Sequence, residues 1–131
     1  MSNKSKPISA SDAISDRVMT GLFSRAFAQP LKLLGQTEAS LSSYAVFWCV
    51  AFNEGSTQVE IARLTGLSAK TVSRVISQLG ETEEGRGWIK QSYDASDRRV
   101  RRLSLSRKGK SVHNKLMKDL HKFNDGLQTA G

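Results

Sequence analysis

Apolar residues between positions 58 and 79 recur at steps of three and four, and this spacing predicts two consecutive helices that share one core. The apolar positions are Ile61, Leu64, Leu67, Val72, Val75, Ile76 and Leu79. Gly66 can adopt the positive φ that a tight turn between the helices requires, and Ala62 is small enough for the helices to cross closely. The segment therefore predicts a helix-turn-helix, with Ser56 or Thr57 as the cap of its first helix.

Three further helices are predicted around this motif. Residues 1–10 are polar and are expected to be flexible, and a helix should follow over residues 11–28 and end at Pro30. A second helix, from residue 37 or 40 to about 53, is apolar nearly all round, as a central core helix would be. The last helix, over about 106–127, carries a narrow apolar stripe. Such a stripe favours a helix–helix seam, either within the fold or between two copies.

Two short strands are predicted between the motif and the last helix. Residues 80–87 form a polar loop, after which residues 88–93 alternate between apolar and polar as a strand does. Residues 94–98 read as a turn and residues 100–105 as the returning strand, so the pair predicts a wing. The fold class is therefore mainly α with a small two-stranded β wing, a winged helix-turn-helix, in one domain over residues 11–131.

The positive charge of the chain is concentrated in its second half. The formal net charge is +8, yet residues 1–60 hold five basic and five acidic side chains. The remaining 15 basic and 7 acidic residues lie at positions 61–131 and account for the whole excess. This asymmetry indicates a polyanionic partner, because each phosphate neutralised by Lys or Arg releases condensed counterions. The alternative is a solvated basic surface that serves solubility.

Other functional classes find little support in the sequence. The longest apolar run, residues 44–52, is about half of the roughly 20 residues that a spanning helix requires, and no secretory signal is recognisable, so a cytoplasmic protein without membrane contact is expected. Cys49 is the only cysteine and lies in an apolar segment, which favours inert packing. His113 and His121 are the only histidines and have no suitable ligand set around them, so we expect no metal, no cofactor and no enzyme activity.

The wing carries a resemblance to a known family. The positions concerned are Asp94, Ala95, Ser96, Asp97, Arg98 and Arg99, followed by Leu105, Ser106, Arg107, Lys108 and Gly109. Over residues 41–109 the chain resembles the MarR family of winged-helix regulators, whose wing reads Asp-Pro-Arg-Asp-Arg-Arg and is followed by Leu-Thr-x-Lys-Gly. The resemblance implies that Arg99 or Arg98 at the wing tip reaches a DNA minor groove and that Asp97 braces the arginine. A solvated hairpin turn is the competing interpretation.

The second helix of the motif supplies the predicted contacts to double-stranded DNA, since such a helix can enter the major groove. Ser68 should cap this helix, and its neighbouring amides would hold a phosphate. Lys70, Thr71 and Arg74 are expected to reach base edges or adjacent phosphates. Ser73, Gln78 and Arg101 are further predicted contacts, and Arg102, Arg107, Lys108 and Lys110 are assigned to phosphates or to the general field. The loop over residues 80–87 is longer than the corresponding family segment, and its Glu81, Glu83 and Glu84 would repel DNA if they faced it.

The resemblance also implies partners. Family members typically form homodimers through their terminal helices, here 11–28 and 107–127, and many release DNA when a small apolar effector binds near the dimer interface. Phe23, Phe27, Phe47 and Trp48 could line such a site or could simply be core residues. The predicted function is a transcriptional regulator, with repression favoured over activation. The alternative is a winged-helix accessory protein of a phage or plasmid that docks to proteins or serves replication, partition or transfer.

Overall fold

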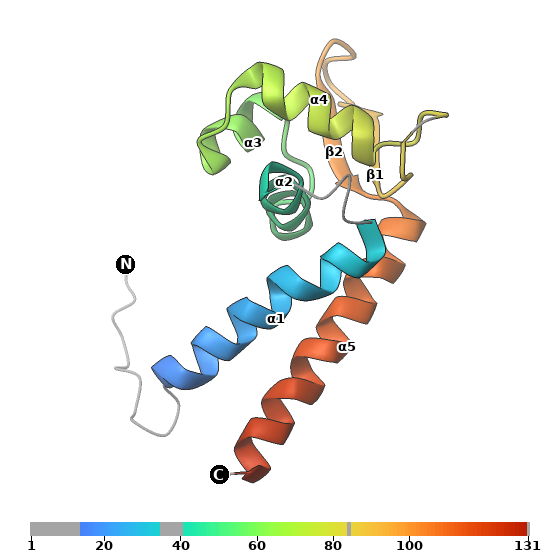
Figure 1. The fold of residues 1–131 in the computed structure, drawn as a ribbon. Helices are drawn as coiled ribbons and strands as arrows, with labels where there is room; N and C mark the ends of the chain where they lie inside the picture. Colours follow the sequence, from blue (N-terminus) through green and yellow to red (C-terminus); the bar gives the residue numbers. More distant parts are fainter. Residues whose placement is uncertain (1–13, 35–40, 84, 131) are drawn as a thin grey trace.

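The computed structural model describes residues 14–34, 41–83 and 85–130, and these form five helices and two strands (Figure 1). In chain order they are α1 (Asp16–Leu34), α2 (Leu41–Phe52), α3 (Gln58–Thr65), α4 (Ala69–Leu79), β1 (Ile89–Tyr93), β2 (Arg101–Leu105) and α5 (Arg107–Ala130). The predicted fold class is confirmed. The predicted flexible segment 1–10 lies outside the described residues.

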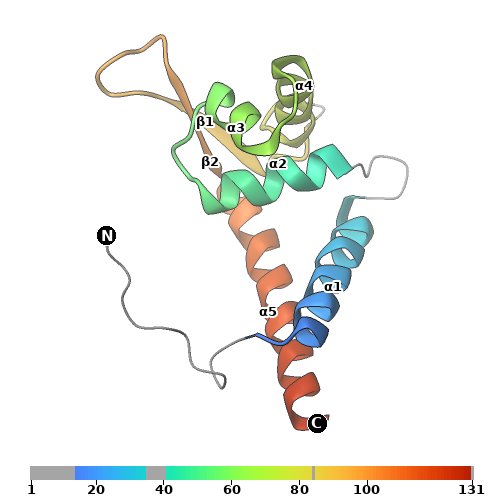
Figure 2. The ribbon, with the colours of Figure 1, turned by 90° about the vertical axis from the view of Figure 1, so that its left-hand side faces the viewer.

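A lobe of α2, α3, α4 and the β-hairpin holds the core, while α1 and α5 extend together from one side of it and run antiparallel (Figures 1 and 2). Most of the buried apolar residues come from α2, α4 and the hairpin, and the rest come from α3 and α5. The full set is Tyr44, Val46, Phe47, Val50, Ile61, Val72, Val75, Ile76, Leu79, Trp88, Ile89, Leu103, Leu105, Val112 and Leu116. The wing tip and α4 lie at the end of the molecule remote from the free ends of α1 and α5 (Figures 1 and 2).

The helix-turn-helix forms for the local reasons that its sequence predicts. Thr57 caps α3 in a capping box: its Oγ1 accepts a hydrogen bond from the Glu60 amide, and the Glu60 carboxylate accepts one from the Thr57 amide. Gly66 has a φ of 80°, which only glycine adopts without strain, and Ser68 caps α4. One core prediction is wrong. Leu64 is 49% exposed, because α3 is short and only its Ile61 side reaches the core.

The first helix differs from its prediction at both ends. It begins at Asp16, where the Ser15 hydroxyl accepts a hydrogen bond from the Val18 amide, and the predicted start at residues 11–13 lies outside the described part of the chain. It also continues through Pro30 to residue 34. A proline removes only one amide donor and strains one turn, so a helix held by tertiary contacts can pass through it. The prediction that Pro30 ends the helix is therefore wrong.

The packing of α1 on α5 supplies those tertiary contacts. The Arg25 guanidinium donates to both carboxylate oxygens of Asp119, at 2.9 and 3.1 Å, and lies over the Phe123 ring. A Cβ atom at Gly21 would lie 2.8 Å from Cε2 of Phe123, so the two helices approach closely at this glycine. The apolar stripe of the last helix thus forms a seam within the fold. The helix ends at residue 130 rather than at the predicted 127.

Two features are absent from the described residues, a membrane-spanning helix and a metal-ligand cluster. None of their helices combines the length and the apolar character needed to cross a bilayer. Nor do they contain three or more His, Cys, Asp or Glu side chains grouped as metal ligands.

Candidate nucleic-acid interface

The solvent face of α4 carries the predicted DNA contacts. A helix turns by about 100° per residue, which places Lys70, Arg74 and Gln78 on one side together with Ser73. All four are exposed. The opposite side is formed by the buried residues Val72, Val75, Ile76 and Leu79. The core therefore fixes the rotation of α4 about its axis and leaves a polar face with two cations open to a partner.

The start of α4 is organised by two of the predicted site residues. The Ser68 hydroxyl accepts a hydrogen bond from the Thr71 amide at 3.1 Å, and the two side-chain oxygens lie 3.0 Å apart. Ser68 is exposed and Thr71 is half-buried. Both hydroxyls are thus engaged in the cap, whereas the amides of Ala69 and Lys70 donate to no acceptor within the described residues. These amides and the positive end of the helix dipole could receive a phosphate oxygen.

The wing tip presents one arginine held by a carboxylate. The Arg99 side chain donates to both oxygens of Asp97, at 3.2 and 3.3 Å, and the Arg99 amide donates to the same carboxylate at 3.0 Å. These bonds hold the pKa of Asp97 below its ordinary value. The Arg99 side chain nevertheless remains 91% exposed. The predicted bracing of a wing arginine by Asp97 is confirmed, and the braced residue is Arg99.

Two further wing arginines lie against an aromatic ring. The guanidinium carbons of Arg98 and Arg101 are 5.7 and 5.5 Å from the centre of the Tyr93 ring. At these distances the ring quadrupole attracts both cations. Both side chains stay exposed, so the ring restricts their positions without removing them from solvent.

Asp94, which the sequence reasoning did not single out, organises the base of the turn. Its carboxylate accepts hydrogen bonds from the amides of Ser96 and Asp97, from the Ser96 hydroxyl and, at 2.7 Å, from Nε of Arg102. The Ser96 and Arg102 bonds hold the pKa of Asp94 far below its usual range. An Asp two residues before a Ser is a sequence signal for such an Asx-type turn and could have identified it.

Arg102 has a structural position that differs from its predicted general role in DNA binding. Besides pairing with Asp94, it donates at 2.9 Å to the carbonyl of Gly55 in the link between α2 and α3. The side chain is only 42% exposed and both of its partners lie within the protein. Its guanidinium therefore joins the wing to the lobe, a structural role that the sequence did not predict.

Further bonds fix the hairpin against the lobe. The Gly55 amide donates to the Leu103 carbonyl at 2.7 Å, and the Leu103 amide donates to the Ser56 carbonyl at 2.8 Å. The carboxylate of Glu54 accepts from the Leu105 amide at 2.8 Å. These bonds attach the wing to the link between α2 and α3, and so hold it beside the helix-turn-helix.

A cleft of about 450 Å³ lies between the start of α3 and the wing. It is lined by Thr57, Gln58, Val59, Gln91, Arg99, Val100 and Arg101. Two arginines thus face the start of a helix across this cleft, an arrangement that suits a phosphate oxygen.

The acidic loop after α4 lies at the far end of that helix from Ser68. Glu81 and Glu83 are exposed, while Glu84 lies outside the described residues. The loop closes on α4 through amides of residues 86 and 87, which donate to the carbonyls of Gln78 and Gly80 at 2.9 and 2.7 Å. Because α4 has 11 residues, its two ends are roughly 16 Å apart, and the loop carboxylates are remote from the predicted DNA contacts at its start.

The four aromatics considered for an effector site fall into two groups. Phe47 and Trp48 pack edge to face in the lobe with ring centres 5.6 Å apart, whereas Phe23 and Phe27 are exposed on α1. Phe27 lies 6.3 Å from the ring of Tyr44, whose buried hydroxyl has no hydrogen-bond partner among the described residues. Cys49 is half-buried, and burial raises the pKa of its thiol, as inert packing requires.

Known proteins resemble this chain in three-dimensional structure rather than in sequence. No protein-family model matches the sequence, and no curated protein is similar to it. The solved transcriptional regulator Tm0710 from Thermotoga maritima superposes with a TM-score of 0.66 at 20% identity, over 88% of this chain and 78% of that one. FabT from Streptococcus pneumoniae, solved in complex with DNA, superposes with a TM-score of 0.58 at 21% identity, over 88% of this chain and 80% of that one. PcaV from Streptomyces coelicolor, solved with its natural ligand, superposes with a TM-score of 0.53 at 26% identity, over 91% of this chain and 84% of that one.

The multiple antibiotic resistance repressor MarR is itself among the similar structures, with a TM-score of 0.59 at 13% identity. Tm0710 and PcaV are transcriptional regulators, and MarR is a repressor. The chain therefore has the winged-helix fold of the MarR-type regulators, as its wing motif predicted.

Proposed function

We propose that this protein is a sequence-specific double-stranded DNA-binding transcriptional regulator that represses by occupying promoter DNA. The observation that carries the proposal is the pairing of two exposed cationic elements on one rigid lobe, the solvent face of α4 and the Arg99 wing tip. The similarity to solved regulators, one of them in complex with DNA, supports the same conclusion.

In this proposal α4 enters a major groove and the wing tip enters the adjacent minor groove. Lys70 and Arg74 project from the first two turns of α4, the part of a recognition helix that meets base edges. Arg99 is held in place by Asp97 before DNA arrives, so less side-chain freedom is lost on binding. A narrow minor groove concentrates negative potential and favours such a guanidinium.

The proposal includes a homodimer held by the terminal helices. One side of α1 packs on α5, yet Met19, Phe23 and Phe27, spaced by four residues, remain 40%, 60% and 45% exposed. An exposed apolar stripe on a helix is a typical protein contact, and a second copy would cover it symmetrically. Two recognition helices could then meet half-sites about one helical turn, roughly 10 base pairs, apart.

A small effector is a further part of the proposal. The hydroxyl of buried Tyr44, which has no hydrogen-bond partner among the described residues, lies next to Phe27 and offers one polar partner in an apolar setting between α1 and α2. Such a setting suits a small aromatic ligand with a polar group. One of the similar solved proteins, PcaV, is bound to its natural ligand.

The experiment is selection of bound sequences from random duplexes, followed by affinity measurements on the recovered site. Recovery of a palindrome is expected. If Arg74 reads a guanine, Arg74→Ala should cost about 1 to 3 kcal/mol on that site and relax the preference at one base pair. Lys122→Ala is the matched control, since it removes one exposed cation from the opposite end of the molecule and should leave affinity within about 0.5 kcal/mol of the parent.

Other outcomes discriminate between the alternatives. Uniform weakening of all duplexes by Arg74→Ala would make this residue a phosphate contact. Selection without any enriched site would refute the proposed regulation and favour the accessory role, in which the same fold docks to another protein or acts in replication, partition or transfer.

A further inference from the structure

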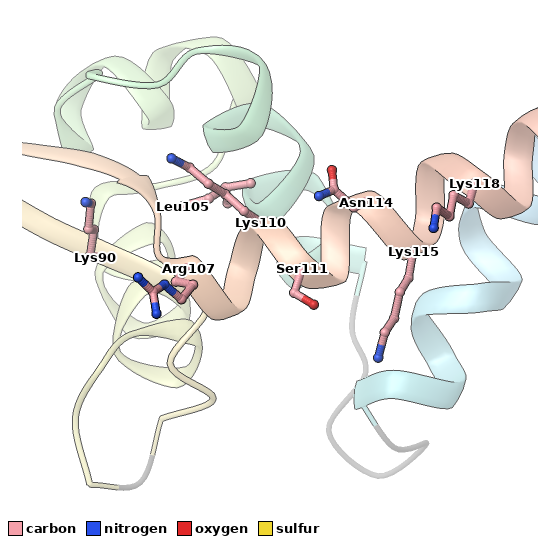
Figure 3. Close-up of a pocket in the computed structure, with 8 residues that line it drawn as sticks. All are labelled: Lys90, Leu105, Arg107, Lys110, Ser111, Asn114, Lys115 and Lys118. Atoms are coloured by element: carbon pink, nitrogen blue, oxygen red, sulfur yellow. The ribbon is translucent and has the colours of Figure 1, made fainter.

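A second cationic surface lies along α5, away from the DNA-binding elements (Figure 3). It is a groove of about 660 Å³ lined by Lys90 of β1, by Arg107, Lys110, Lys115 and Lys118 of α5, and by Leu105, Ser111 and Asn114. We call it the α5 groove. Arg107 and Lys118 lie on the side of α5 opposite the buried Val112 and Leu116. The groove is therefore a solvent face that is separate from the seam with α1.

The five cations of the groove are not neutralised by the protein. None of them forms an ion pair within residues 14–34, 41–83 and 85–130, and no carboxylate is among the eight lining residues. By contrast, Arg25, Arg99 and Arg102 each pair with an aspartate. Arg107 and Lys110, and likewise Lys115 and Lys118, stand three residues apart on the helix, where like charges repel. An anionic partner would relieve this repulsion.

The position of the groove separates it from DNA held by α4 and the wing tip. Each strand of the hairpin has five residues, so the groove begins about 16 Å from the tip. From there α5 leads further away, and Lys118 lies roughly another 16 Å along the helix from Arg107. Figure 3 shows the side chains following α5 in this order, from Lys90 and Arg107 at the strand end to Lys118.

The chemistry of the lining favours a peptide over a nucleic acid. The lining offers no aromatic ring on which single-stranded bases could stack. Four of the five cations are lysines, whereas the wing displays arginines, whose planar fork suits phosphates and bases. Lysine ammonium groups on flexible stems can pair with carboxylates in many geometries.

We propose that the α5 groove binds an acidic segment of a partner protein, laid along α5 with its carboxylates on the five cations. Such a site would connect the DNA-bound protein to a second macromolecule. Arg107 and Lys110, which the sequence assigned to phosphates or to the general field, line this groove, whereas the α4 and wing-tip contacts of the proposed DNA interface do not. The groove can therefore be tested independently of α4 and the wing tip.

The test measures binding of a fluorescein-labelled peptide of alternating glutamate and serine to the full chain by fluorescence anisotropy at about 0.1 M salt. Lys115→Glu should weaken binding about three- to tenfold, because it removes one exposed attraction and adds a repulsion. Lys108→Glu is the matched control. It reverses one exposed charge on the same helix outside the groove, so it should weaken binding less than about twofold. Circular dichroism verifies that both variants are folded.

A duplex competitor separates the two surfaces. Replacement of Lys70 and Arg74 by alanine should weaken duplex binding by at least about tenfold and leave the peptide affinity within about twofold of the parent. Equal losses in Lys115→Glu and Lys108→Glu would show attraction by net charge only and would overturn the proposal. Loss of duplex affinity in Lys115→Glu, together with displacement of the peptide by duplex, would assign the groove to DNA and also overturn it. Absence of peptide binding to the parent protein would likewise overturn the proposal.

Discussion

Gly109 is the position at which a single methyl group should disturb this fold most directly. It lies in the first turn of α5, where the helix backbone touches Trp88 at the start of the hairpin. A Cβ atom there would overlap the carbonyl oxygen of Trp88 and lie 2.9 Å from its carbonyl carbon, whereas ordinary contacts begin at 3.4 Å. The obstacle is backbone and cannot rotate away. In Gly109→Ala, α5 must therefore separate from Trp88, which is buried in the core.

The magnitude follows from two opposing effects. Overpacking of this kind costs about 1 to 3 kcal/mol, and a rigid backbone obstacle puts the cost at the upper end of that range. The gain from replacing a helical glycine by alanine offsets roughly 1 kcal/mol of it. The shift also strains the cap, in which the Ser106 hydroxyl accepts from the Gly109 amide at 3.0 Å. A net loss of about 2 kcal/mol in unfolding free energy is expected.

Gly126 provides a control in the same helix. Among the described residues, a Cβ atom at this exposed position meets no heavy atom within 4 Å, so the change in helix preference dominates. Gly126→Ala should therefore stabilise the protein by a few tenths to about 1 kcal/mol. The two variants carry the same substitution with opposite expected signs. Urea unfolding followed by circular dichroism measures both. A Gly109→Ala protein as stable as the parent would refute the close approach of α5 to Trp88.

Two further predictions concern the dimer and the wing. Phe23→Glu should convert the dimer into a monomer in light scattering, because it places a charge in the proposed apolar interface. Phe52→Glu, at an 89% exposed position on the lobe, should leave the dimer intact. A monomeric parent protein would contradict the proposed dimer. Asp94 should titrate well below its ordinary pKa of 3.8, because hydrogen bonds from Ser96 and Arg102 favour the carboxylate. Its contribution to stability is then fully present above the unfolded pKa and lost as the pH falls through the lower folded pKa. Asp94→Asn should remove this dependence of stability on acid pH. If NMR showed the Asp94 carboxyl titrating at its ordinary pKa, the prediction would be contradicted.

The parts of the fold that sequence predicted well have local causes. The caps at Thr57 and Ser68 depend on bonds between residues three positions apart, and the Gly66 turn depends on one φ angle. The error at Leu64 has a different origin. Helical spacing identifies the side of a helix that faces inward, but it does not indicate how far the core extends along a short helix.

The same distinction applies to the site. The exposure of Lys70 and Arg74 follows from helical spacing alone, and Asp97 and Arg99 are only two residues apart. The role of Arg102 could not be predicted in this way, because its carbonyl partner, Gly55, lies 47 positions away. Only the folded chain brings the two together.

The basic half of the chain consequently divides into groups with different uses. Arg102 joins the wing to the lobe, Arg99 and the α4 cations face the proposed DNA, and the α5 groove holds five more cations away from them. A net charge calculated from sequence cannot separate these groups, because it contains no positions. The division has a measurable consequence: the salt dependence of DNA binding, about 0.9 in logarithmic slope per neutralised phosphate, should reflect the α4 and wing cations and not the groove. A slope that fell after reversal of Lys115 would place the groove on the duplex instead.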